Sequence, residues 1–165
     1  MATIAEPRDL LLTELQSMLY VEQRLADDVL PELQRQITHD DFKADVQEHL
    51  EETRRHVTNL ERAFELLGQE PKPDKSHAVD GLVAQHEKVA KNIKSDDLLD
   101  LFDASAAAKT EHFEIAAYES MITSAVALGE SEIVSLLEEN LDEEKAALKK
   151  VEKASKEIAS ESAVA

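Results

Sequence analysis

Acidic residues stand at positions where a helical pattern calls for apolar ones. In the stretch 97–128, the core-facing spacing of an amphipathic helix runs through Ala108, Glu111 and Ile115. Glu111 lies in the middle of this line, and Glu114 follows one turn later. An ionised carboxylate inside a helical bundle is costly unless it is paired or binds a metal ion. This stretch is therefore predicted to have a functional role in addition to its part in the core packing.

The same anomaly recurs three more times along the chain. Glu22 occupies the centre of an apolar stripe in the first helical segment, and His49 and Glu52 follow the edge of the next stripe. Near the end of the chain, two adjacent acids lie on or beside a fourth stripe. The candidate metal ligands are, in chain order, Glu22, His49, Glu52, Glu111, Glu114, Glu143 and Glu144.

The composition restricts which metals and partners these residues can serve. The 165-residue chain has no cysteine, so a metal must be held by carboxylate and imidazole groups, which suit Fe, Mn or Zn. The net charge of −18 argues against nucleic acid or an anionic membrane as a partner. Because no basic leader and no apolar run of about 20 residues is found, we expect a soluble, cytoplasmic protein.

Periodicity and helix-ending residues predict an all-α protein with a single domain over residues 1–165. Glycine and proline are scarce, at 3 and 4 residues, while good helix formers abound. Pro31 is expected to kink the first helix near Val29, and residues from Ser160 onward are expected to form a frayed tail. The predicted helices span about 7–37, 41–67, 78–92, 97–128 and 131–159. Phe42, Phe64 and Phe102 are assigned to the core, and His39, His77 and His86 to loops or the surface.

An internal repeat relates the two halves of the chain. When residues 47–54 are aligned with 138–145, Leu50 meets Leu141 and Glu52 meets Glu143. Two helical hairpins packed together would bring carboxylates from four helices to one level of the bundle. Carboxylate-bridged di-metal proteins use this arrangement, and we predict that this chain forms a ferritin-like four-helix bundle with a short fifth crossover helix.

Several assignments remain open at this stage. Stripe position favours Glu144 as a ligand, whereas the repeat favours Glu143. His49 is a ligand or a residue that orients one, and His56 and His112 are expected nearer the edge of the site. Tyr118 either forms a hydrogen bond to a ligand carboxylate or fills the core.

Three motifs resemble those of the YciF-like stress-response proteins, ferritin-like bundles related in fold to rubrerythrin. They are residues 49–53 (HLEET), 111–118 (EHFEIAAY) and 141–145 (LDEEK). The resemblance implies a five-helix fold, a homodimer and a di-iron or di-manganese site, with Glu111 and Glu114 matching the Glu-x-x-Glu of rubrerythrin's third bundle helix. Members often carry an Asp five residues before the first glutamate, but here that position is Ser17.

We therefore expect a di-metal (Fe or Mn) carboxylate protein of the stress response that carries out peroxide, O2 or iron redox chemistry. Whether it is an enzyme is left open. The alternative is a non-enzymatic helical-bundle dimer that binds metal structurally or acts as an interaction or scaffold protein. A third reading, a metal-free protein, requires the buried acids to be protonated or solvated.

Overall fold

The computed structural model describes residues 4–162, and within that range every regular element is a helix. The all-α class predicted from the sequence is thereby confirmed. Within residues 4–162, no helix is both long enough and apolar enough to span a membrane. The elements are α1 (Pro7–Arg24), η1 (Leu25–Val29), α2 (Leu30–Gln36), α3 (Asp40–Leu66), α4 (His77–Ala90), α5 (Asp96–Leu128) and α6 (Ser131–Ser162).

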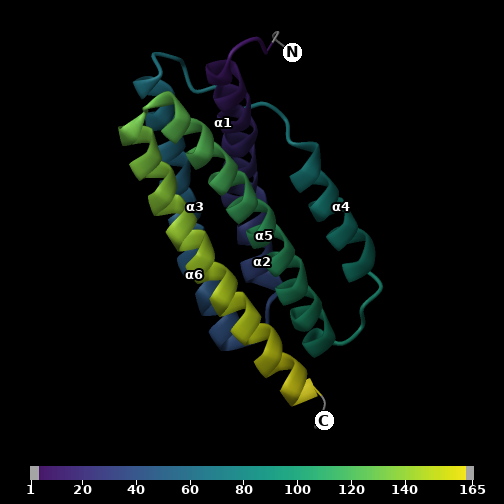
Figure 1. Ribbon diagram of the computed structural model, residues 1–165. Helices are drawn as coiled ribbons and strands as arrows, with labels where there is room; N and C mark the ends of the chain where they lie inside the picture. Colours follow the sequence, from purple (N-terminus) through teal and green to yellow (C-terminus); the bar gives the residue numbers. More distant parts are fainter. Residues whose placement is uncertain (1–3, 163–165) are drawn as a thin grey trace.

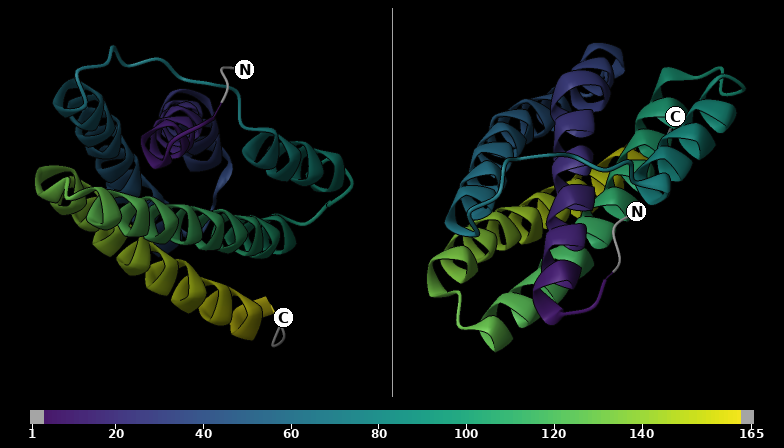
Figure 2. Two further views of the ribbon diagram at one scale, coloured as in Figure 1. Left: turned by 45° about the horizontal axis from the view of Figure 1, so that its top comes forward. Right: turned by 90° about the horizontal axis from the view of Figure 1, so that it is seen from above.

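Four long helical segments pack side by side and enclose the core (Figure 1). The first segment is the continuous run of α1, η1 and α2, and the others are α3, α5 and α6. Around the bundle, α1 contacts α3 and α5, and α6 contacts the same two helices from the other side. The short helix α4 lies outside this group against α5, as both views in Figure 2 show.

The helix ends lie at or near the capping residues identified in the sequence. Gly129 terminates α5 with a backbone φ of +76°, a conformation that glycine adopts at little cost. Helix α3 begins one residue earlier than expected, because His39 is its N-cap and its Nδ1 accepts a hydrogen bond from the N–H of Phe42. A frayed tail was expected from Ser160, but α6 continues through Ser162; residues 163–165 lie outside the described range.

The first segment changes its winding just before Pro31. Residues Leu25–Val29 form a π-helical turn, in which backbone bonds span five residues, and the chain then returns to α-helix at Leu30. Proline lacks an N–H and crowds the preceding turn, so a local rearrangement at this place is expected. The hydrophobic periodicity survives, and Leu25, Leu30 and Leu33 are all buried.

Two polar contacts fix the connections between helices. Asp100, 2% exposed near the start of α5, accepts hydrogen bonds from the backbone N–H groups of Thr38 and His39 and from the Thr38 hydroxyl. It therefore holds the turn between α2 and α3. At the other end of the crossover, the Tyr20 hydroxyl donates to Asp80 over 3.0 Å and ties α4 to α1.

Two sequence assignments near α4 are corrected by the structure. Phe102 is only half-buried, because it lies at the edge of α5, where its ring stacks on that of His86 with centroids 5.4 Å apart. His86 is not a simple surface residue, because its Nε2 lies 2.6 Å from the fully buried Oδ1 of Asp103. Phe42 and Phe64 are fully buried, as predicted.

Replacing Asp100 should destabilise the fold. In Asp100→Ala, two backbone N–H groups at the α2–α3 turn lose their acceptor, which should lower the free energy of unfolding by about 2–3 kcal/mol. Urea denaturation measures this change. The control is Asp142→Ala at an exposed position on α6, where we expect a change within about 0.5 kcal/mol. Equal stability of the two variants would contradict the anchoring role.

Candidate metal centre

Six buried polar side chains converge in the middle of the bundle. They come from all four long segments, since α1 supplies one, α3 two, α5 two and α6 one. Their exposed fractions lie between 0% and 7%, which is exceptional for ionisable residues. The six residues are Glu22, His49, His56, Glu111, Glu114 and Glu144, and they are called the central cluster below.

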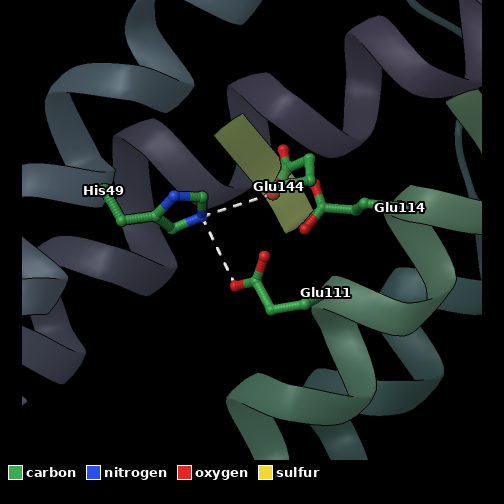
Figure 3. A group of neighbouring side chains, drawn as sticks. All are labelled: His49, Glu111, Glu114 and Glu144. Carbon is green, nitrogen blue, oxygen red and sulfur yellow. Dashed lines mark ion pairs between the residues drawn. The ribbon is translucent and has the colours of Figure 1, made fainter. Parts of the chain in front are cut away.

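The central cluster contains two groups that share one residue. In the first, His49, Glu111, Glu114 and Glu144 each offer one ligand atom, and these atoms lie within 4.8 Å of one another (Figure 3). In the second, Glu22 and His56 meet the same Glu144 within the same distance. Glu144 therefore lies between two subsites, each with nitrogen and carboxylate donors.

Each histidine of the central cluster also contacts a carboxylate that lies outside the cluster. Oε2 of Glu52 lies 3.3 Å from Nδ1 of His49, whose Nε2 faces Glu111 at 3.4 Å and Glu144 at 3.8 Å. Oε2 of Glu143 lies 2.9 Å from Nε2 of His56. These contacts fix the ring orientations, as the partners of metal-binding histidines usually do. Glu52 and Glu143, which the repeat pairs, thus occupy equivalent places.

The other nitrogen of His56 faces the cluster. Its Nδ1 lies 3.0 Å from Oε1 of Glu144 and 3.3 Å from Oε1 of Glu22, but the angles do not satisfy a hydrogen bond. On the outer side, Glu143 also accepts a 2.7 Å bond from Arg55. The charge of Glu143 is therefore balanced by Arg55 at the edge of the central cluster. Glu144, by contrast, is fully buried.

A second network holds Glu22 in place. The buried Tyr118 hydroxyl donates to Oε1 of Glu22 and accepts a 3.0 Å bond from Nδ2 of Asn140. Asn140 in turn accepts a 2.7 Å bond from Asn59. Tyr118 therefore has both of the roles considered for it. Its hydroxyl forms a hydrogen bond to a candidate ligand, and its ring packs in the core.

The electrostatics of the cluster reflect crowding of like charges in an apolar interior. Burial raises the pKa of the Glu114 carboxyl well above its usual value, and Glu144, Glu22 and Glu111 raise it further. Burial likewise raises the pKa of Glu111, although His49 opposes this effect. Burial by itself lowers the pKa of the His56 imidazole, but Glu22 and Glu144 outweigh it and raise the pKa to about 11.

Several buried oxygen and nitrogen atoms of the cluster have no hydrogen-bond partner among the described residues. Both oxygens of Glu114 and of Glu144 are in this state, as are Oε2 of Glu22 and Glu111 and Nδ1 of His56. Buried polar groups are almost always satisfied in folded proteins. The converging, unsatisfied atoms are all good ligands for Fe or Mn, so the donor set fits a metal centre.

The structure brings together most, but not all, of the residues selected from the sequence. Glu22, His49, Glu111, Glu114 and Glu144 belong to the central cluster, whereas Glu52 and Glu143 contact its histidines from outside. The sequence analysis placed His56 nearer the edge, yet its ring is fully buried in the cluster. The spacing of three and four had placed His49, Glu52 and His56 on one line along α3, but spacing alone does not show which of them faces inward.

Comparison with known proteins identifies the family. Residues 6–164 match the family described as a domain of unknown function, DUF892. The chain is 30% identical to the Escherichia coli protein YciF over 128 residues, which is 77% of each chain. The chain belongs to the DUF892 family of YciF-like proteins.

Solved structures of similar sequence share the arrangement of helices. A Rhodopseudomonas palustris protein named YcfI, for which a structural role has been suggested, is 37% identical with a TM-score of 0.88 over 90% of this chain and 94% of its own. The E. coli stress protein YciF is 26% identical with a TM-score of 0.89 over 95% of this chain and 99% of its own. A Xanthomonas campestris protein at 21% identity, with a TM-score of 0.75 over 94% of each chain, shares the fold.

An apolar residue in place of Glu114 should stabilise the metal-free protein. The carboxyl is fully buried and unsatisfied, so Glu114→Leu should raise the free energy of unfolding in chelator-treated samples by about 1–3 kcal/mol. Urea denaturation provides the measurement. An exposed control, Glu139→Leu on α6, should change stability by about 0.5 kcal/mol at most. Loss of stability in Glu114→Leu would show that the carboxyl makes a stabilising contact without metal.

Proposed function

We propose that this protein is a ferritin-like di-metal carboxylate protein that binds two Fe or Mn ions per chain. The observation that carries the proposal is the set of unsatisfied oxygen and nitrogen atoms in two groups that share Glu144. A four-helix bundle in which all four long helices supply inward-pointing carboxylates or imidazoles is the known setting of such centres. The crossover helix α4 between the two hairpins agrees with a ferritin-like connection.

The charges of the cluster match two divalent cations. Four buried carboxylates, on Glu22, Glu111, Glu114 and Glu144, would be neutralised by two such ions. In the metal-free protein the same carboxylates must be protonated or paired with histidine, which is costly in an apolar interior. Metal binding would therefore relieve the electrostatic strain of the bundle.

The residues would divide the work of holding the metals. His49, Glu111 and Glu114 would hold one ion, Glu22 and His56 the other, and Glu144 would lie between them. Among the outer contacts, Glu52 would keep His49 in orientation. Glu143 would do the same for His56, and Tyr118 for Glu22.

A di-iron or di-manganese centre supplies two-electron redox chemistry, and we propose peroxide reduction or iron oxidation as the reaction. The carboxylates suit this role because a glutamate can bind through one oxygen or two as the metal charge changes. No cysteine is present to act as a thiol reductant, so peroxide reduction would take its two electrons from a separate donor, whereas iron oxidation would take them from Fe²⁺ itself. The name of the E. coli relative, a stress protein, supports a role of this kind in the stress response.

A structural role for the metal is the second candidate. The description of the R. palustris relative YcfI, at 37% identity, as a structural protein agrees with a role without turnover. On this reading the ions hold four helices together in a homodimer without turnover. Metal-loaded protein that leaves added peroxide unchanged would favour this second candidate over redox chemistry.

Metal analysis is the decisive test. Elemental analysis of protein purified without chelator, or loaded with Fe or Mn, should give about two ions per chain. Glu144→Gln should lose both, because Glu144 belongs to both groups, whereas His49→Ala and His56→Ala should each weaken one subsite. Circular dichroism checks that the variants remain helical.

The matched control is Glu139→Gln, an exposed acid on the same helix as Glu144, which should keep the full metal content. Absence of metal in the wild-type protein after loading would refute the proposal. Equal loss in Glu144→Gln and Glu139→Gln would show adventitious binding to an acidic surface. Sedimentation analysis of the same samples tests the proposed homodimer.

A further inference from the structure

A cleft of about 640 Å³ opens between the first helical segment, α4 and α5. Its lining includes His49 and Glu111 of the central cluster. Nearer the N-terminal end of α5, Phe102 and Asp103 also line it. Sites for small organic ligands usually measure roughly 300–1,000 Å³. The cleft is therefore large enough for a molecule of one or two rings beside the cluster.

Part of its wall is apolar. Leu30 and Leu33 line the side formed by α2, and Leu82 and Val83 line the side formed by α4. On α5 the wall is low, because the lining residues include the small side chains of Ala106 and Ala107. The exposed parts of these walls would bury the apolar body of a ligand.

One polar group is fixed in the wall of the cleft. The fully buried Asp103 accepts a 2.7 Å bond from Nε2 of Gln36, and its other oxygen lies 2.6 Å from Nε2 of His86. A carboxylate only accepts, so this contact places a proton on Nε2 of His86; when the ring is neutral, Nδ1 is an acceptor. Stacking on Phe102, with an interplanar angle of 8°, holds the ring still.

The acceptor at Nδ1 has no partner in the structure of residues 4–162. The His86 side chain is 22% exposed, and the residue lines the cleft. A hydroxyl group is the natural complement of a fixed imidazole acceptor. This wall therefore selects a ligand that can donate a hydrogen bond.

The charges of the lining disfavour anions. Six acidic residues face three lysine or arginine residues around the cleft. Arg24 is paired with Asp28, and Arg35 with Glu32. Lys109 is the remaining cation, and its Nζ lies 6.0 Å from the Phe102 ring. A ligand carrying a carboxylate or phosphate would meet net repulsion, so an uncharged molecule fits better.

The two polar ends of the cleft are separated by a distance that matches a small aromatic molecule. Asp103, the partner of His86, and Glu111 are eight residues apart on α5, which is about 12 Å along the helix axis. A ring system placed against Ala106 would lie between these two levels. Its far edge would then approach the His49 and Glu111 side of the central cluster.

We propose that the cleft binds an uncharged aromatic molecule that carries a hydroxyl group. The hydroxyl donates to Nδ1 of His86, and the ring lies along the alanine wall toward Glu111. The role of this molecule as a substrate or electron donor of the metal centre rests on the function proposed above. Its binding does not, because the cleft is formed by the protein alone.

The test uses 1-naphthol as the probe and the full, metal-free chain as the receptor. Titration followed by ¹H–¹⁵N NMR should show saturable binding at one site, with shifts at cleft residues of α4 and α5. Loss of the donor in 1-methoxynaphthalene should weaken binding about tenfold, and the anion 1-naphthoate should also bind more weakly. Absence of saturation, shifts elsewhere on the molecule, or equal binding of all three compounds would overturn the proposal.

A pair of phenylalanine variants on α5 provides the structural control. Ala106→Phe fills the cleft and should weaken 1-naphthol binding at least about tenfold, whereas Ala127→Phe, at an exposed position outside the cleft, should leave it unchanged. Equal affinities in the two variants would count against the site. If Ala106→Phe loses helicity, the NMR map of the wild-type protein decides alone.

Metal content measured on the same wild-type preparation separates the two proposals. Naphthol binding without metal binding would overturn the di-metal function and leave the cleft standing. Metal binding without naphthol binding would overturn only the cleft proposal.

Discussion

Four carboxylates are buried at one level of an apolar helical bundle, and their charge limits how the four long segments can pack. These groups are almost fully buried, so their mutual repulsion is only weakly screened. Every long segment contributes at least one member of the central cluster, so the cost is shared by the whole core. The helices can pack closely only if protons, histidines or metal ions balance this charge.

The two halves of the chain meet this constraint in different ways. In the aligned repeat, His49 on α3 corresponds to Asn140 on α6, and Thr53 corresponds to Glu144. Helix α3 therefore supplies nitrogen atoms, while α6 supplies the shared carboxylate. Glu52 and Glu143, by contrast, have the same role in both halves. Each contacts a histidine of the central cluster from outside it. A symmetric fold thus carries an asymmetric set of ligand atoms.

The first segment and α4 add a feature that a plain four-helix bundle would lack. The π-helical turn at Leu25–Val29 and the displacement of α4 to the outside of the bundle leave a cleft beside the cluster. Asp103 and His86, which pack against each other across this region, form a fixed polar pair in the wall of the cleft. The central cluster is consequently closed to water around Glu114 but borders the cleft at Glu111.

Local sequence patterns were enough to predict the helices, their approximate ends and the acids at core positions. Periodicity is a local property, so Glu22, Glu111 and Glu114 could be selected from single helices. The choice between adjacent candidate residues depends instead on how the helices pack. Glu144 lies inside and Glu143 at the rim, because the rotation of α6 is set by its packing against α3 and α5. The same holds for the inward place of His56, the outer place of Glu52 and the pairing of His86 with Asp103, since each depends on residues distant in the chain.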